Sequence, residues 1–114
     1  MKIDIRTRNI ENENMAREYI ERKVHFALDR IDARIQKVTV RLDDETKDSS
    51  RFDGLCRIEI DVHPRGQLFV SSRGDSIYDC VLQAVRKMEH AVKHDLDRHR
   101  SSSRIRHQHA RQQS

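Results

Sequence analysis

The residues of this chain that could do chemistry are cations gathered on one stretch of predicted helix. Between positions 86 and 94 the basic side chains are Arg86, Lys87, His90, Lys93 and His94, and Glu89 is the only acidic one. Cations at this spacing suit contacts with the phosphates of a nucleic acid. The alternative is a solvated helix face that keeps the protein soluble, which is the commonest setting for surface lysine and arginine. The scarcity of acids in this stretch favours nucleic-acid binding.

Two of these residues, His90 and His94, stand four positions apart, a spacing that can hold a metal ion. A metal site needs further ligands, and no His-Glu-x-x-His or Cys-x-x-Cys pattern accompanies them. We therefore expect surface histidines that contact phosphate, and we expect the same of His107 and His109. The sequence also lacks a Gly-rich phosphate loop and a recognisable nucleophile motif. We predict a protein that is not an enzyme and that has no metal, cofactor or small-molecule substrate.

Charge is distributed unevenly along the 114 residues, whose formal net charge is +4. Five arginines and no acidic residue follow Asp97, so residues 1–97 carry 18 basic and 19 acidic side chains. Binding of a polyanion must then depend on how the charges of the body are arranged, with help from the tail. The tail is rich in Ser, Arg, His and Gln, and Ile105 is its only large apolar residue. We predict one domain over residues 1–98 and a basic disordered tail over 99–114.

Cysteine usage and hydropathy indicate the cellular setting. Cys56 and Cys80 are the only cysteines, and they fall on positions that should face the core. With no signal peptide apparent, this predicts a cytoplasmic protein with both thiols reduced, in which Cys80 packs and does not react. No apolar run approaches the ~20 residues of a membrane helix, so we expect no membrane partner.

The periodicity of apolar residues predicts the elements that must position the cations. Alternation indicates strands over residues 2–8, 35–43, 56–62 and 67–73. Helical spacing indicates a helix over 14–32 and a second from Asp75 that frays near Arg98. The order is β-α-β-β-β-α, an α+β fold. Because each strand alternates, we expect a four-stranded sheet with two helices packed on one face and solvent on the other.

Local patterns add finer expectations. Asp75 is predicted to cap the last helix, and Asn12 or Asn14 the first. The first helix should carry its apolar stripe on Met15, Tyr19 or Ile20, Val24, Ala27 or Leu28, and Ile31, beside ordinary ion pairs one turn apart. The acidic segment 43–53 lacks the spacing of a calcium loop and is interpreted as a solvated hairpin tip. Alternation ending at Val62 is one residue out of phase with the turn at 63–66, which predicts a bulge or an altered turn.

Several of these segments, in this order and spacing, are typical of one family. They are the turn His63-Pro64-Arg65-Gly66, then Leu68 and Val70, then Asp75-Ser76-Ile77-Tyr78, then Lys87-Met88-Glu89-His90, together with Arg22-Lys23-Val24 in the first helix. Over roughly residues 2–98 the chain resembles the ribosome hibernation promoting factors, also called ribosome-associated inhibitors or sigma-54 modulation proteins. The resemblance is to the short form, without the additional C-terminal domain with which long members pair ribosomes.

This resemblance implies a partner and a set of binding residues. The partner is the small ribosomal subunit, bound through 16S rRNA in the channel that mRNA and tRNA use. The protein would hold the ribosome idle under stress by occupying that channel, as a monomer or a weak dimer. The implied contacts, with neighbouring cations of the same faces, are Arg22, Lys23, Arg30, Arg86, Lys87, His90, Lys93, His94 and Arg98.

Some features differ from the family pattern, and they support an alternative. The loop at 43–53 is longer and more acidic than usual, and His90 and His94 replace the more usual arginine or lysine. The alternative is a regulatory protein-interaction module of a divergent branch that has lost tight ribosome binding, in which the basic tail and the acidic loop contact other proteins.

Overall fold

The computed structural model describes residues 1–29, 31, 34–46, 51–63 and 66–112, with side chains as far as residue 97. Its elements are β1 (Lys2–Arg8), α1 (Glu13–Leu28), β2 (Ile35–Asp44), β3 (Gly54–Val62), β4 (Gln67–Gly74) and α2 (Ile77–Gln112). The predicted order β-α-β-β-β-α is therefore confirmed, with strand bounds within two residues of those expected. Among the described helices, none is long and apolar enough to cross a membrane.

The four strands form one mixed sheet in the order β1-β2-β3-β4. β1 and β2 are parallel, because α1 carries the chain back across the sheet between them, while β2, β3 and β4 follow as antiparallel neighbours. Ile5, Val40 and Ile58 lie in register on adjacent strands and point to the same face. The alternation of the sequence thus gives the sheet one apolar face, as expected.

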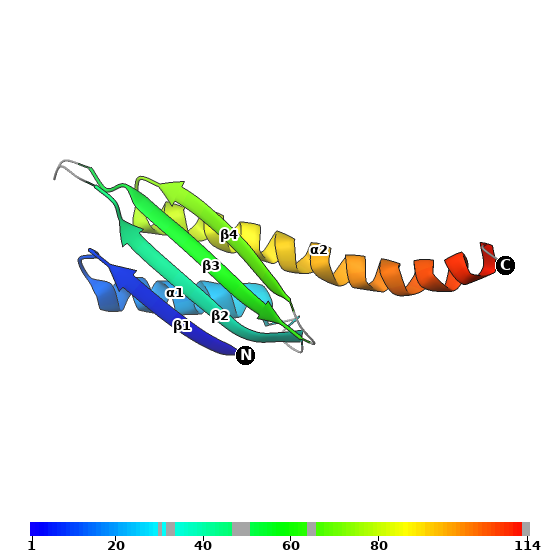
Figure 1. The fold of residues 1–114 in the computed structure, drawn as a ribbon. Coiled ribbons are helices and arrows are strands. Elements are labelled where there is room, and N and C mark those ends of the chain that lie inside the picture. The colour runs from blue at the N-terminus through cyan, green and yellow to red at the C-terminus, as the bar shows by residue number, and fades with distance from the viewer. Residues whose placement is uncertain (30, 32–33, 47–50, 64–65, 113–114) are drawn as a thin grey trace.

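Both helices cover that apolar face and leave the opposite face of the sheet open (Figure 1). α2 packs against β3 and β4, and α1 packs against β1 and α2. The buried residues of α1 are Ala16, Ile20, Val24 and Leu28, and those of α2 include Cys80, Val81, Ala84, Val85, Met88 and Val92. The predicted stripe of α1 is wrong at its start, since Ala16 is buried and Met15 is 54% exposed. The stripe predicted for α2 is confirmed, with Ile77 only partly buried.

The first turn of α2 is capped by Ser76 and not by Asp75, which corrects the prediction. The Ser76 hydroxyl accepts a hydrogen bond from the backbone N–H of Asp79 at 3.1 Å, and its carbonyl accepts one from Cys80 at 3.0 Å. A side-chain oxygen that satisfies the third free N–H of a helix is the usual serine cap. Asn12 occupies the corresponding position of α1 in a left-handed conformation but makes no side-chain cap.

A glycine lets α2 begin close to the end of β4. A β-carbon placed on Gly74 would lie 2.8 Å from the backbone nitrogen of Cys80 and 3.0 Å from its α-carbon. No side chain fits there without moving backbone, so glycine is needed for this approach. The start of α2 is therefore fixed against the same end of the sheet as the β2–β3 loop, because Gly54 pairs with Gly74 across the ladder.

The β2–β3 loop, predicted to be a solvated acidic tip, is partly neutralised. The Asp44 carboxylate accepts hydrogen bonds from the backbone N–H groups of Thr46 and Asp53, at 3.0 and 3.1 Å, and from the Thr46 hydroxyl. These bonds, led by the Thr46 hydroxyl, lower the pKa of Asp44. Arg73 of β4 forms ion pairs with Glu45 at 2.9 Å and Asp53 at 3.6 Å. Residues 47–50 lie outside the described residues.

The expected irregularity near Val62 is a shift of register in the neighbouring strand. Ile35 pairs with Val62 and Lys37 with Asp61, so Gln36 of β2 is the extra residue. One unpaired residue in an antiparallel ladder is a β-bulge. The turn itself is closed by a hydrogen bond from Val62 N to Gly66 O at 3.0 Å, while Pro64 and Arg65 are not among the described residues.

The last helix continues well beyond the point where the sequence predicts fraying. α2 is described as far as Gln112, so the predicted end near Arg98 is wrong. Its final turns project past the sheet without an element beside them (Figure 1). The backbone over 99–112 is helical in this structure, and the division into a domain over 1–98 and a basic disordered tail over 99–114 stays a prediction.

Candidate nucleic-acid interface

A hollow lies between the exposed surfaces of α1 and α2, and predicted site residues from both helices line it. This helix cleft has a volume of about 770 Å³ and is lined by Arg22, His25, Phe26, Ala27, Asp29, Ile31, Glu89 and Lys93. Arg22 and Lys93, far apart in sequence, thus reach one surface. The packing of α1 against α2 brings them there, because Val24 and Val92 are buried in the common core and turn their neighbours outward.

A pair of tyrosines joins the helices next to the cleft. Tyr19 of α1 and Tyr78 of α2 make an edge-to-face contact, with ring centroids 4.9 Å apart and planes at 86°. The Arg22 guanidinium lies 6.0 Å and the Lys23 ammonium 5.6 Å from the centroid of the Tyr19 ring. Contacts of a cation with an aromatic face contribute about 0.5–1 kcal/mol each at exposed sites. The tyrosines therefore position two of the predicted cations without neutralising either charge.

The cations of α2 are used in different ways. Lys93 forms an ion pair with Glu89 at 3.1 Å, so the single acid in this stretch offsets one of its charges. The Lys87 ammonium donates a hydrogen bond to the Ser71 carbonyl of the edge strand β4 at 2.9 Å, and no described carboxylate forms an ion pair with it. The rings of His90 and His94 are stacked, with centroids 6.4 Å apart and planes at 10°.

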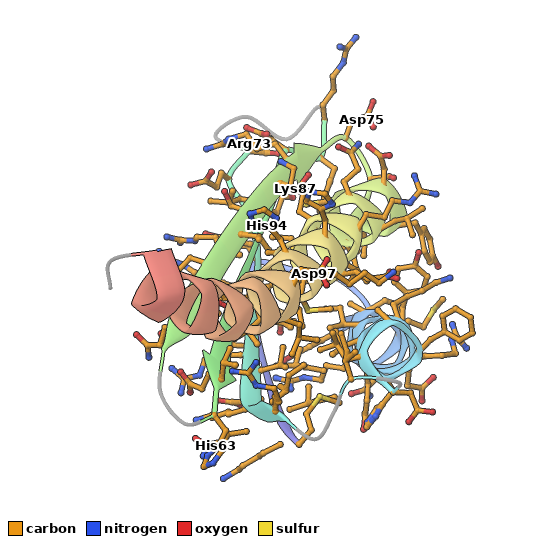
Figure 2. All side chains as sticks on the ribbon, turned by 90° about the vertical axis from the view of Figure 1, so that its right-hand side faces the viewer. His63, Arg73, Asp75, Lys87, His94 and Asp97 are labelled. Carbon is orange, nitrogen blue, oxygen red and sulfur yellow. The ribbon has the colours of Figure 1, made fainter. Side chains whose placement is uncertain are left out.

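These side chains do not form a single strip. Figure 2, seen along α2, shows Lys87 and His94 on the side of the helix toward β4, away from α1. Lys93 lies on the other flank, in the helix cleft. Arg86 and His90, four residues apart on exposed positions, occupy the outer surface between the two flanks. These basic side chains therefore form a broad band around the exposed side of α2, and the cleft lies along one flank of this band.

Two predicted site residues cannot be placed. Arg30 lies outside the described residues, and for Arg98 only the helical backbone is described. Arg17, which was not predicted as a site residue, is used structurally: it pairs with Glu13 at 3.0 Å and donates to the Ile5 carbonyl of β1 at 2.7 Å. The pairs Glu13–Arg17 and Glu21–His25 confirm the expected ion pairs one turn apart on α1.

Both cysteines are packed in the core, and the described histidines are not grouped with other metal-binding side chains. Cys56 and Cys80 are free and fully buried, as expected for packing residues. Burial raises the pKa of the Cys56 thiol to about 12, with a smaller contribution from Cys80, and burial likewise raises the pKa of Cys80. Among the described residues, no cluster of His, Cys, Asp or Glu side chains is arranged to hold a metal ion.

Sequence reasoning missed the aromatic part of the cleft. Phe26 lines the cleft and is 85% exposed, while Tyr78 is 53% exposed and lines a separate hollow with Met15 and Ile77. The signal was available: Phe26 is two residues from Val24 and Leu28, which places it on the opposite side of the helix from the core.

A comparison with family models identifies the family. The model described as sigma 54 modulation protein / S30EA ribosomal protein matches residues 3–100. The chain belongs to this family. The match covers the sheet, α1, the cleft and α2 as far as residue 100, and it confirms the resemblance seen in the sequence. No curated protein sequence matches significantly.

Solved structures of similar fold support the assignment to the S30EA family. The N-terminal domain of Protein Y from Thermus thermophilus has a TM-score of 0.67 at 25% identity, over 82% of this chain and 98% of that chain. A ribosomal subunit interface protein from Coxiella burnetii has a TM-score of 0.68 at 15% identity, over 85% of this chain and 99% of that chain. The second similarity is one of fold.

Proposed function

We propose that this protein is a non-enzymatic ribosome-associated stress factor that binds the small subunit through the helix side of its fold. The contacts are made to 16S rRNA in the channel for mRNA and tRNA, and the folded body excludes both ligands while it is bound. No bond is made or broken in this mechanism, because occupancy of the channel is enough to keep the ribosome idle.

Family membership supports the choice of partner. The family description names a ribosomal protein, and the similar structure from Coxiella burnetii is described as a ribosomal subunit interface protein. A polyanionic partner also agrees with the helix side of the molecule, where rings or a carbonyl contact Arg22, Lys23 and Lys87, and no described carboxylate forms an ion pair with them.

The observation that carries the proposal is the helix cleft, which is lined by cations from both helices, by the acids Asp29 and Glu89, and by the exposed ring of Phe26. Arg22 and Lys93 offer charge to phosphates, and Phe26 offers a surface to a base or sugar. Folded RNA presents phosphates from several strands at once, so a rigid surface with cations at fixed separations recognises its shape. The ion pair of Lys93 with Glu89 leaves this lysine exposed and able to exchange its partner for a phosphate, because an exposed pair is worth only about 0.2–1 kcal/mol.

The proposal is tested by sedimentation of purified small subunits with the full chain at increasing salt. Since binding depends on several phosphate contacts, the logarithm of the binding constant should fall linearly with the logarithm of salt concentration. Arg22→Gln or Lys93→Gln should weaken binding and lower the magnitude of this slope by about 1 each, because each removes one cation.

Arg51→Gln is the matched control, because Arg51 is exposed in the β2–β3 loop, away from the cleft. It should bind as the wild type does. Failure of the wild type to co-sediment at low salt would overturn the proposal. In cell extracts, partners that remain after nuclease has destroyed the RNA would support the protein-interaction alternative.

A further inference from the structure

The face of the sheet opposite the helices carries a second cationic surface that the function proposed above does not use. The register places Arg6, Arg41 and Arg57 directly opposite one another on β1, β2 and β3, with Ser71 of β4 completing the line. All three arginines are exposed. Figure 1 shows that no helix covers this face.

This arginine row is unfavourable for folding alone. Neighbouring strands are about 4.8 Å apart, and like charges directly opposite each other on a sheet destabilise it. Carboxylates relieve the repulsion only in part: Arg6 contacts Asp4 at 3.1 Å, and Arg41 is 4.0 Å from Glu59. The side chain of Arg57, on an inner strand of the sheet, makes no ion pair or hydrogen bond with any described residue. The row therefore holds positive charge that an anionic ligand would stabilise.

An exposed aromatic ring stands beside the row. Phe69 of β4 is 68% exposed and pairs with Glu59 in the neighbouring line of residues. Phe69, Ser71, Arg41, Arg57 and Glu59 line a hollow of about 490 Å³ on this face. An exposed ring next to arginines on an open sheet combines the two features that single-stranded nucleic acid requires, which are a face on which a base stacks and cations for the phosphates.

We propose that this sheet face binds a short segment of single-stranded RNA, with one base stacked on Phe69 and the backbone following Arg57 and Arg41 across the strands. Duplex RNA fits poorly, because its bases are already stacked inside the helix. A second copy of the chain also fits poorly, because two-fold pairing through this face would set the arginine rows against each other. Binding tolerates different sequences, because every base has a stacking surface and the row reads only phosphates.

Fluorescence anisotropy of the full chain with a labelled oligouridylate tests this inference. Phe69→Leu, which keeps an apolar side chain but removes the ring, should weaken binding by roughly 5-fold to 150-fold. Phe69→Tyr keeps the ring and should bind as the wild type does. Arg57→Gln should weaken binding and lower the magnitude of the salt slope by about 0.7, the value for one phosphate contact on a single strand.

Two controls show whether binding is specific to this surface and to unpaired RNA. Arg51→Gln, which removes an exposed cation of the β2–β3 loop, should leave oligouridylate binding unchanged, and an RNA hairpin without a single-stranded end should compete poorly. Equal binding by Phe69→Leu and wild type would overturn the inference, and so would the absence of oligouridylate binding at low salt. Neither result depends on ribosomes, so the inference can fail while ribosome binding holds.

Discussion

Lys87 and Lys93 show how much the role of a residue depends on its exact position. Both are exposed lysines of α2, yet one contacts the carbonyl of Ser71 and the other lines the cleft beside α1. Six helical positions rotate a side chain by about 240° around the axis, so the two cannot lie on one line. This rotation follows from the sequence and the helical period. Which strand or helix lies beside each lysine is known only from the tertiary structure.

The alignment of the sheet arginines depends on the tertiary structure in the same way. Alternation in the sequence places Arg57 on the solvated side of its strand, but the line that it forms with Arg6 and Arg41 depends on register between strands. Register is set by non-local pairing and by the bulge at Gln36, which no local pattern located. The arginine row could therefore not be predicted from the sequence.

The two thiols should be unreactive in the folded protein. With the pKa of Cys56 raised from 9.0 to about 12 by burial, only about one thiol in ten thousand is ionised at pH 8. Labelling with a disulfide reagent at pH 8 should therefore give no fast reaction in native buffer and two thiols per chain in urea. Fast labelling of the native protein would show that the core around Cys56 and Cys80 is not formed as described.

The same shift implies a loss of stability at high pH. Because the pKa is higher in the folded than in the unfolded chain, the neutral thiol favours folding below the unfolded value near 9. This contribution is lost as pH rises from about 9 toward about 12, so the midpoint of urea unfolding should fall over that window.

At the scale of elements, the start of α2 gives a prediction that separates two neighbouring residues. Ser76→Ala removes the hydroxyl that accepts from Asp79 N–H and should lower the free energy of unfolding by about 1 kcal/mol. Asp75→Ala, at an exposed position outside the cap, should change it by less than about 0.5 kcal/mol. Urea unfolding followed by circular dichroism measures both. A larger loss of unfolding free energy for Asp75→Ala than for Ser76→Ala would contradict the Ser76 cap and support the Asp75 cap expected from the sequence.

The elements were largely predictable and their ends were not. Strict alternation in β2 and β3 and the stripe of α2 come from burial on one side, which leaves a clear period. The stripe of α1 was misplaced at Met15 because this residue is as apolar as a core residue, although Ala16 is the one that fits against the sheet. The end of α2 was misjudged because the apolar pattern stops near Leu96, while the helical backbone continues to Gln112.

At the scale of the whole molecule, a near-neutral body does not exclude a polyanionic partner. Acidic side chains pair with Arg17 and Arg73 at sites away from the cleft, so overall neutrality hides local surpluses of positive charge. The hollow on the sheet face keeps such a surplus, with Arg41 and Arg57 against Glu59, next to the exposed Phe69. In the helix cleft Arg22 and Lys93 are matched by Asp29 and Glu89, next to the exposed Phe26. A four-stranded sheet with both helices on one face separates these two surfaces by the thickness of the core.

The most direct test of the account is site-specific cross-linking from the cleft. A photoreactive benzoylphenylalanine in place of Phe26, which is 85% exposed, should be illuminated in the complex with small subunits, and the sites mapped by reverse transcription. The account predicts cross-links to 16S rRNA nucleotides that line the mRNA and tRNA channel. Cross-links confined to ribosomal proteins or to rRNA outside the channel would contradict it.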